Sequence, residues 1–335
     1  MDFKSLTLIA EIGSVHDGSF GNAKNLIEAA SSAGANCVKF QTHIASAETL
    51  ALAPNPPYFQ DESRTEYFDR TSFTLDKWKQ LKQHATQFNV YFISSPFSLE
   101  SVDLLEEVGI EVFKVPSGEV TNHPLLEKLA RLGKPVILST GMSCWNEIES
   151  AVNILIDNTP LCIMQCTSMY PTPAKFVGLN NLLDFKNRFP AVSIGFSDHT
   201  LGLSASISAV ALGATVIEKH FTFSRLMYGS DAKNSMEPSE FLKLSNELQF
   251  AFEIIKNPVN KDSLALNQLS SMKLTFQKSI VASRDLCSGD IISLDDLAFK
   301  KPGGGICASK YQLLIGKKLK MSVQLDHTFS LCDFQ

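Results

Sequence analysis

Two lysines interrupt apolar runs of this 335-residue chain, at 37-CVKFQ-41 and 112-VFKVP-116. An unpaired ammonium group is costly to bury, so Lys39 and Lys114 need anionic partners. Side chains alternate along a strand, which lets each lysine point one way while its apolar neighbours point the other. With Ser or Thr hydroxyls nearby, two such lysines make a receptor for phosphate and carboxylate groups. A structural Lys–Glu pair is the alternative that this pattern leaves open.

Two histidines, His199 and His220, end the last two of eight strand-like runs. If these strands are neighbours, the two imidazoles converge and can hold a divalent ion that keeps open positions for water and substrate. Open positions suit ions that prefer oxygen, so we expect Mn²⁺ or Mg²⁺, with Co²⁺ as a further option. Two purely structural histidines are the alternative. Four others are interpreted as structural or surface residues: His43, His84, His123 and His327.

The elements that must position these residues follow a regular alternation. Short apolar, β-branched runs cover 6–13, 37–43, 90–97, 111–118, 135–142, 161–168, 192–199 and 215–221. Helical patterns lie between them at 21–34, 74–88, 98–109, 124–133, 145–157, 178–189 and 201–213, and 237–256 closes the series. Such alternation predicts parallel strands joined by right-handed crossovers. Eight units predict an α/β fold of the (β/α)₈ TIM barrel type.

A barrel enzyme builds its site at the carboxyl ends of the strands. Polar residues gather at these ends in most units: Glu11, His16, Lys39, Gln41, Ser94, Ser95, Lys114, Ser117, Glu119, Ser139, Thr140, Thr167, Ser168, Tyr170, Ser197, Asp198, His199, Glu218, Lys219 and His220. Any one of them alone is usually a satisfied polar residue at a strand end. Together they predict one polar site.

The regular alternation of strand-like and helical patterns stops after the closing helical pattern. We predict a catalytic barrel over residues 1–256, a polar linker with some helical character over 257–276, and a small β-rich domain over 277–335. The last segment carries short apolar runs and turn signals such as Ser-Gly-Asp and Gly-Gly-Gly. The linker is long enough to permit an exchange of the small domain between two subunits.

Composition excludes several classes of function. The net charge is −5 and Lys/Arg clusters are short, so no nucleic-acid partner is expected. No apolar run approaches the roughly 18 residues of a membrane helix, and the start of the chain has no signal-peptide pattern. We therefore expect a cytoplasmic protein without a membrane partner. The seven scattered cysteines favour free thiols.

Eight motifs occur in an order that resembles the sialic acid synthase family (N-acetylneuraminate synthase and its relatives, including legionaminic and pseudaminic acid synthases). They are 11-EIGSVHDG-18, 38-VKFQTH-43, 93-ISSPFS-98, 114-KVPSGE-119, 138-LSTGM-142, 166-CTSMYPTP-173, 194-IGFSDHT-200 and 217-IEKHFT-222. The last segment, with 300-KKPGGG-305, resembles the family's antifreeze-like (SAF) domain. The resemblance implies a transferase of sialic acid and polysaccharide biosynthesis. It would condense phosphoenolpyruvate with an N-acylated hexosamine aldehyde, giving a nine-carbon 2-keto acid and phosphate.

The resemblance also implies roles for matching positions. Phosphoenolpyruvate would be bound by Lys39, Ser95, Lys114, Ser117, Ser139, Ser168 and Ser197. The sugar would contact Glu11, Gln41, Tyr170, Asp231 and, from the partner subunit of a domain-swapped homodimer, Lys301. The divalent metal would be bound by His199 and His220, which with Glu119 form the catalytic set.

Two departures from the family pattern concern the acceptor sugar. Val15 stands where the first loop usually has Asn, and Lys301 stands where many members have Arg, which keeps the charge but loses the planar fork. The acceptor therefore stays open among N-acetylmannosamine, its 6-phosphate and a diamino-trideoxyhexose. Three other functions remain as alternatives: another phosphoenolpyruvate-condensing deoxy-ketoacid synthase, a catalytically inactive carbohydrate-binding relative, and a Schiff-base aldolase.

Overall fold

The computed structural model describes residues 3–50, 53–55 and 62–335. The chain divides into two compact units, one ending at residue 256 and one covering 257–335. Within the described ranges no helix is both long and apolar enough to cross a lipid bilayer. All seven cysteines are free.

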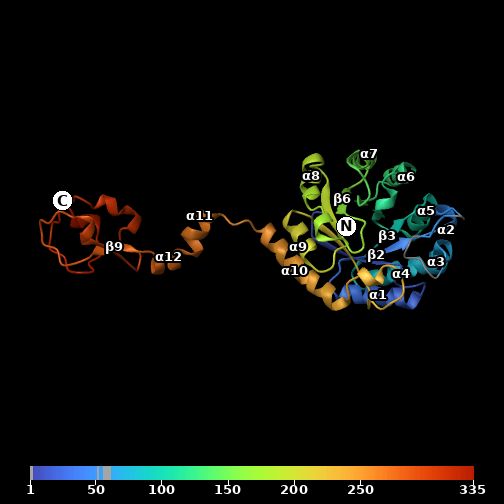
Figure 1. Ribbon diagram of the computed structural model, residues 1–335, viewed down its shortest axis with the longest axis horizontal. Helices are drawn as coiled ribbons and strands as arrows, with labels where there is room; N and C mark the ends of the chain where they lie inside the picture. The colour runs from blue at the N-terminus through green and yellow to red at the C-terminus, as the bar shows by residue number, and fades with distance from the viewer. Residues whose placement is uncertain (1–2, 51–52, 56–61) are drawn as a thin grey trace. The chain divides into compact units, whose positions relative to one another are not determined.

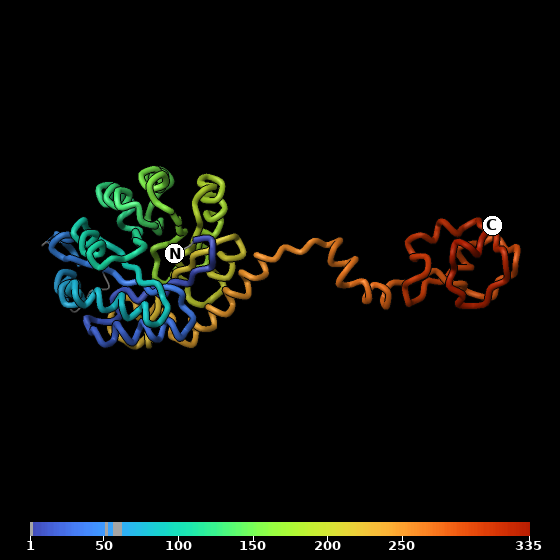
Figure 2. Tube along the Cα trace, turned by 180° about the vertical axis from the view of Figure 1, so that it is seen from behind, coloured from blue at the N-terminus to red at the C-terminus, as the bar shows by residue number. Residues whose placement is uncertain are grey.

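Parallel strands of the first unit close into an eight-stranded barrel in chain order, which confirms the predicted (β/α)₈ fold. The strands are β1 (Thr7–Gly13), β2 (Cys37–Thr42), β3 (Tyr91–Pro96), β4 (Phe113–Val115), β5 (Val136–Ser139), β6 (Leu161–Cys166), β7 (Ser193–Asp198) and β8 (Val216–His220). The helices lie on the outside of the ring of strands in both views (Figure 1, Figure 2).

The helices of this unit follow the predicted pattern, with two additions. They are α1 (Phe20–Ser32), α2 (Ala45–Glu48), α3 (Arg64–Thr71), α4 (Leu75–Gln87), α5 (Leu99–Val108), α6 (His123–Leu132), α7 (Trp145–Leu155), α8 (Asn180–Arg188), α9 (Ser204–Ala211) and α10 (Pro238–Lys256). The additions, α2 and α3, belong to the long connection between β2 and β3, where the sequence pattern indicated no helix.

Local sequence signals explain where several helices begin and end. Ser98 accepts a hydrogen bond from the backbone of the first turn of α5, and Gly109 ends that helix in the left-handed conformation. Helix termini favour these residue types. The Ser98 side chain satisfies a backbone N–H group at the start of the helix, and glycine adopts the left-handed conformation in which its own N–H satisfies carbonyl groups at the end. Ser63 forms a capping box with Glu66 and so begins α3. The sequence of α3 does not show the regular spacing of apolar residues that would predict a helix.

Two layers of inward-facing side chains fill the barrel. The lower layer is apolar and is formed mainly by Ile9, Cys37, Ile93, Val112, Ile137, Met164 and Val216. Two residues further along the same strands stand Glu11, Lys39, Ser95, Lys114, Ser139, Cys166 and Glu218. A separation of two keeps side chains on one face of a strand. The apolar layer therefore supports a polar layer directly above it, at the carboxyl ends.

Strand register brings β7 and β8 together at this polar end. Asp198 lies opposite Lys219, and Glu11 of β1 lies opposite His220. On the outer face, the Asp198 carboxylate lies 2.9 Å from the Lys219 ammonium group, and both side chains are almost fully buried. This ion pair fixes β7 against β8 immediately before His199 and His220.

The second unit begins with α11 (Lys261–Ser263), a π-helical turn (Leu264–Gln268) and α12 (Ser270–Phe276). An antiparallel pair follows, β9 (Ser279–Ala282) and β10 (Leu297–Lys300), with several isolated bridges. Its small core contains Ile280, Leu286, Ile292, Leu314, Leu319, Phe329 and Phe334. Residues of the expected small domain thus have their own core, with short strands and turns as predicted.

Candidate active site

A cavity of about 510 Å³ lies at the carboxyl ends of the barrel strands. Most of the predicted site residues line it: Glu11, Lys39, Gln41, Lys114, Ser117, Ser139, Ser168, Tyr170, Ser197, His199, His220 and Asp231. They come from strand ends and following loops all around the barrel. The structure therefore brings together residues that are separated by up to 220 positions in the chain.

The floor of the cavity is a buried cluster of charges. The Lys39 ammonium group lies 3.1 Å from Glu11 Oε1 and 3.5 Å from Glu218 Oε1, and the Lys114 ammonium group lies 3.6 Å from Glu218 Oε2. Lys114 also donates a hydrogen bond to Ser139 Oγ at 2.6 Å. The Lys–Glu pairing that the sequence left open is thus present, and it lies in the wall of a cavity.

The two carboxylates of this cluster differ in pKa. Burial raises the pKa of Glu11 to about 7, against the opposite effect of Lys39. Burial alone would also raise the pKa of Glu218, but the charges of Lys114 and Lys39 lower it to about 2. Below pH 7 a protonated Glu11 leaves two lysines facing one carboxylate. The cluster can then attract an anion.

A second feature suited to an anion surrounds Gly141, just beyond β5. The Gly141 N–H donates a hydrogen bond of 2.9 Å to Ser117 Oγ. A Cβ atom at this position would meet Ser168 Oγ at 2.5 Å, Ser117 Oγ at 2.8 Å and Cys166 Sγ at 3.0 Å. The glycine therefore leaves room for hydroxyls that converge from the loops after β4 and β6. Hydroxyl donors in such a cradle suit phosphate oxygens.

The two predicted metal ligands are neighbours. The ring centroids of His199 and His220 are 5.5 Å apart. His199 Nδ1 lies 2.8 Å from the Thr167 carbonyl, so its proton is on Nδ1 and the lone pair is on Nε2. His220 Nδ1 is buried, without a hydrogen-bond partner in the described residues, 3.9 Å from Asp231 Oδ2. Burial lowers the pKa of His220, which favours the neutral imidazole that a metal requires. These residues fit a divalent ion, although no three-ligand cluster occurs within the described ranges.

The wall beside the charge cluster is a chain of hydrogen bonds. Gln41 Nε2 donates to Glu11 Oε1 at 2.7 Å, and Gln41 Oε1 lies 3.2 Å from His43 Nε2. His43 Nδ1 lies 2.7 Å from Glu48 Oε1, and its ring stacks between Phe68 and Phe97. His43 therefore orients the Gln41 amide. The sequence-based interpretation of His43 as a structural or surface residue missed its place in the cavity wall.

Three predicted site residues do not line the cavity. Ser95 is fully buried beneath it and lies 3.4 Å from the Lys39 ammonium group, so it holds this lysine. Glu119 is half-buried in the short helical turn after β4 and accepts a hydrogen bond from Asn122 Nδ2 at 2.7 Å. Burial raises the pKa of Glu119. Lys301 belongs to the second unit, where its ammonium group lies 5.1 Å from the centre of the Phe276 ring.

Several cavity residues escaped the sequence-based assignment of roles. Glu218 was recognised at the end of its strand but given no function, and Arg64, Tyr67 and Phe68 of α3 were not considered. The signal for Glu218 was available, since a carboxylate in an apolar strand needs a partner as much as a lysine does. Nothing comparable marks the residues of α3, because they follow no strand.

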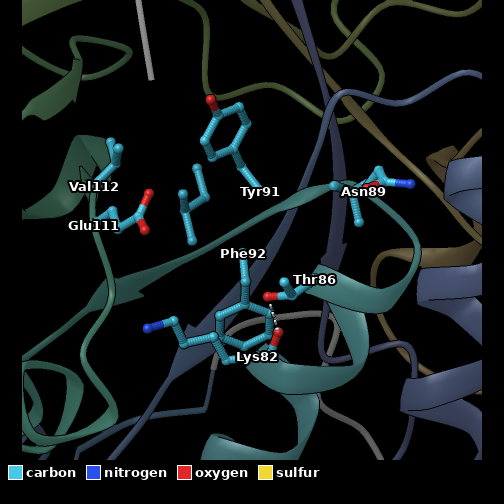
Figure 3. A pocket seen from close by; sticks show the side chains of 9 residues that line it. Lys82, Thr86, Asn89, Tyr91, Phe92, Glu111 and Val112 are labelled. Carbon is cyan, nitrogen blue, oxygen red and sulfur yellow. Dashed lines mark hydrogen bonds between the residues drawn. The ribbon is translucent and has the colours of Figure 1, made fainter.

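A smaller cavity of about 300 Å³ opens at the other end of the barrel. It lies at the start of β3 and between α4 and β4, and Figure 3 shows Lys82, Tyr91 and Glu111 around it. The Lys82 ammonium group already binds the Gly109 carbonyl at 2.5 Å. The amino ends of barrel strands usually serve stability and not catalysis.

Comparisons with known proteins agree with this arrangement. A model described as the NeuB family matches residues 26–260, and one described as the SAF domain matches residues 277–326. The chain is 40% identical to an N,N'-diacetyllegionaminic acid synthase of Campylobacter jejuni, over 94% of this chain and 96% of that protein. It is 33% identical to the N-acetylneuraminate-9-phosphate synthase of Homo sapiens, over 96% and 90% of the two chains. The crystal structure of an N-acetylneuraminic acid (sialic acid) synthetase from Leptospira borgpetersenii in complex with citrate superposes with a TM-score of 0.69. That protein is 30% identical and the match covers 80% of this chain and 93% of that one.

Proposed function

The chain belongs to the NeuB family, and on this premise we propose that it is a sialic-type acid synthase. It condenses phosphoenolpyruvate with an N-acylated hexosamine aldehyde. With one water molecule the reaction gives a nine-carbon 2-keto acid and phosphate. The observation that carries this proposal is the polar layer at the carboxyl ends. There a lysine–serine anion receptor lies in one cavity with two converging histidines.

Phosphoenolpyruvate fits the part of the cavity formed by Lys114, Ser139 and the Gly141 cradle. Lys114 is directed at Ser139 Oγ, and its pKa is lowered by burial, so an incoming anion relieves the cost of its desolvation. Ser117 and Ser168 add hydroxyl donors on either side of Gly141. These groups would hold the phosphate, and Lys39 on the far side of Glu218 would hold the carboxylate.

The acceptor sugar would lie against Glu11, Gln41, Tyr170 and Asp231. These groups offer fixed hydrogen-bond donors and acceptors for sugar hydroxyls. The hydrogen bond between Glu11 and Gln41 and the bond from Gln41 to His43 leave little freedom in that wall. Preorganised contacts of this kind reduce the entropy lost when two substrates meet.

His199 and His220 would hold a divalent ion, Mn²⁺ or Mg²⁺. When bound, such an ion supplies Lewis-acid polarisation of the aldehyde oxygen. The Thr167 carbonyl fixes the ring of His199 by accepting a hydrogen bond from its Nδ1–H group, and Asp231 lies beside His220. The protein thus orients the His199 ring before any ion arrives.

In the condensation, C3 of phosphoenolpyruvate attacks the aldehyde carbon, and positive charge develops at C2. Water adds to C2, and phosphate leaves as its C–O bond breaks. Glu119 would stabilise the charge at C2 or take the proton of the attacking water. Its raised pKa suits proton exchange. Since it does not line the cavity, its role requires a change of position, and full turnover by Glu119→Gln would remove it from the mechanism.

The homodimer with exchanged small domains remains part of this proposal. Between residues 264 and 276, apolar side chains are exposed in the single chain: Leu266, Leu269, Met272, Leu274 and Phe276. Such a run needs a covering surface. A complementation test decides where Lys301 acts. Lys114→Met and Lys301→Met chains, each of low activity alone, regain activity as a mixed dimer if Lys301 serves the partner's site, and stay inactive if it serves its own.

The reaction is tested by phosphate release from phosphoenolpyruvate with a panel of acceptors and Mn²⁺. The panel contains N-acetylmannosamine, its 6-phosphate and 2,4-diacetamido-2,4,6-trideoxymannose. Acceptor-dependent release supports the proposal. A chain that binds the sugars but releases no phosphate is an inactive carbohydrate-binding relative. Inactivation by borohydride with pyruvate would instead reveal a Schiff-base aldolase.

A further inference from the structure

Arg64 is the first residue of α3 and lines the cavity at the carboxyl ends of the strands. Its backbone is held firmly, because its N–H donates to Asn55 Oδ1 at 3.0 Å and the preceding Ser63 forms the capping box of the helix. Among the described residues it is the one arginine in this cavity wall. The backbone from which the Arg64 side chain reaches the cavity is therefore fixed at the start of α3.

The guanidinium of Arg64 has neither a hydrogen-bond nor an ion-pair partner within the ranges that the structure describes. Its Nε is buried without a hydrogen bond, and no carboxylate lies within ion-pair distance. The two lysines of the cavity differ in this respect, since each faces a carboxylate. Arg70, in the same helix, binds both Asp17 and Glu62. Within residues 3–50, 53–55 and 62–335, Arg64 is thus a cation of the cavity wall without a carboxylate partner.

A stack of side chains connects Arg64 with the sugar wall. The His43 ring lies 3.7 Å from the Phe68 ring, centroid to centroid, and the Arg64 guanidinium lies 5.4 Å from the Phe68 centroid on α3. His43 in turn contacts Gln41. The acceptor wall therefore continues from Gln41 past an aromatic face to a guanidinium group. This is the order of groups that an elongated polar ligand would meet.

We propose that Arg64 determines acceptor specificity by binding an oxygen-rich substituent of the sugar, either a phosphate ester or an acyl carbonyl. The inference rests on the proposed function and deepens it. Guanidinium groups bind planar or tetrahedral oxygen groups through paired N–H donors, and an uncompensated one does so most strongly. The substituent lies at the end of the acceptor away from the Lys114 receptor, because that receptor serves phosphoenolpyruvate.

The similar proteins illustrate both kinds of substituent. One is named for a product with a 9-phosphate, and another for a product with two N-acetyl groups. The shared chemistry is an acceptor oxygen at the far end of the sugar. Two matched pairs of acceptors separate the sources. N-Acetylmannosamine 6-phosphate and N-acetylmannosamine differ by the phosphate. 2,4-Diacetamido-2,4,6-trideoxymannose and 2-acetamido-2,6-dideoxymannose differ by the second acyl group, which replaces a hydroxyl.

The test compares the wild type with Arg64→Met, which keeps a long side chain over Phe68 but removes the donors. For each pair, the ratio of kcat/KM for the substituted and the plain acceptor is measured. We expect this ratio to fall about tenfold or more for one pair, with an unchanged KM for phosphoenolpyruvate. Arg64→Lys should recover part of it. Arg131→Met, which alters an exposed arginine of α6, is the matched control and should leave both ratios unchanged.

Calorimetric titration of the same acceptors, without phosphoenolpyruvate, separates this inference from the reaction itself. Discrimination that depends on Arg64 in binding, with no phosphate released, would contradict the condensation and leave the role of Arg64 intact. Equal ratios in the wild type and Arg64→Met, or no binding of either substituted acceptor, would overturn the assignment. A folding defect lowers kcat/KM for the substituted and the plain acceptor by the same factor. It therefore leaves their ratio unchanged.

Discussion

The Ser117 hydroxyl lies 2.9 Å from the backbone nitrogen of Gly141, so the loop that follows β4 is hydrogen-bonded to the loop that follows β5. Ser168, from the loop after β6, completes the space around the same glycine. Three consecutive strand–loop units thus meet at a position where only a residue without a side chain fits. We propose that this space binds the phosphate of phosphoenolpyruvate.

A methyl group at this position should fill the phosphate site. In Gly141→Ala the new Cβ would meet Ser168 Oγ at 2.5 Å and Ser117 Oγ at 2.8 Å. We expect the KM for phosphoenolpyruvate to rise about tenfold or more, with a smaller change in the KM for the acceptor, as measured in initial-rate assays. Gly21→Ala, in α1 with only a distant neighbour at 4.0 Å, is the control. Equal KM values in wild type and Gly141→Ala would place the phosphate elsewhere.

Removing one partner of the buried Asp198–Lys219 ion pair should destabilise the barrel more than replacing both partners. Lys219→Met leaves a buried carboxylate uncompensated and should lower the free energy of unfolding by about 3–5 kcal/mol. The double variant Asp198→Asn/Lys219→Met should recover much of this loss. Lys79→Met removes an exposed pair 3.8 Å long and should cost less than about 1 kcal/mol. Denaturant unfolding measures all four proteins, and a double variant as unstable as Lys219→Met would contradict the account.

The stability of the barrel should fall on acidification because of His16. Burial against Phe73 lowers the pKa of His16 to about 4, whereas the unfolded chain has the ordinary value near 6.5. Between these values the unfolded state binds the extra proton, so the free energy of unfolding decreases as pH falls from about 6.5 to 4. The slope from this group is at most about 1.4 kcal/mol per pH unit.

Replacing His16 should therefore flatten the pH dependence. His16→Asn keeps an acceptor for the Gly18 N–H but has no titrating group. Its unfolding, followed between pH 5 and 7 by the fluorescence of Trp78 and Trp145, should show a smaller slope than the wild type. An identical slope in both proteins would mean that His16 titrates alike in the folded and unfolded states.

Tight binding of a divalent ion should require both His199 and His220. Calorimetric titration with Mn²⁺ should show one site in the wild type and a loss of tenfold or more in affinity for His199→Ala and for His220→Ala. His123→Ala, in α6, is the control. A chelator should abolish phosphate release and added Mn²⁺ should restore it. Unchanged Mn²⁺ binding in the two variants would exclude this pair as the metal site.

Much of the site was predictable because side chains alternate along a barrel strand, so residues two positions apart point to the same side. Lys39 and Glu218 each stand two residues beyond an apolar inward position, so alternation alone places them in the polar layer. Their partners were not predictable in the same way. Lys39, Lys114 and Glu218 come from β2, β4 and β8, and no local pattern says which charges meet inside a closed ring.

The cavity rim was less accessible to sequence reasoning. Arg64 and Phe68 belong to a short helix in the long connection after β2, which has neither strand alternation nor a clear apolar face. His43 follows a strand and carries the same signal as His199, but its stacking between two aromatic rings depends on where α3 folds back. The roles of Asp231 and Lys301 came from family resemblance alone.

The most direct test of the condensation uses phosphoenolpyruvate labelled with ¹⁸O in the oxygen that bridges C2 and phosphorus. After turnover with the preferred acceptor and Mn²⁺, mass spectrometry follows both products. The account predicts a nine-carbon 2-keto acid in equal amount to phosphate, with the label in the phosphate because the C–O bond breaks. Phosphate without the label, or pyruvate in place of the nine-carbon acid, would contradict it.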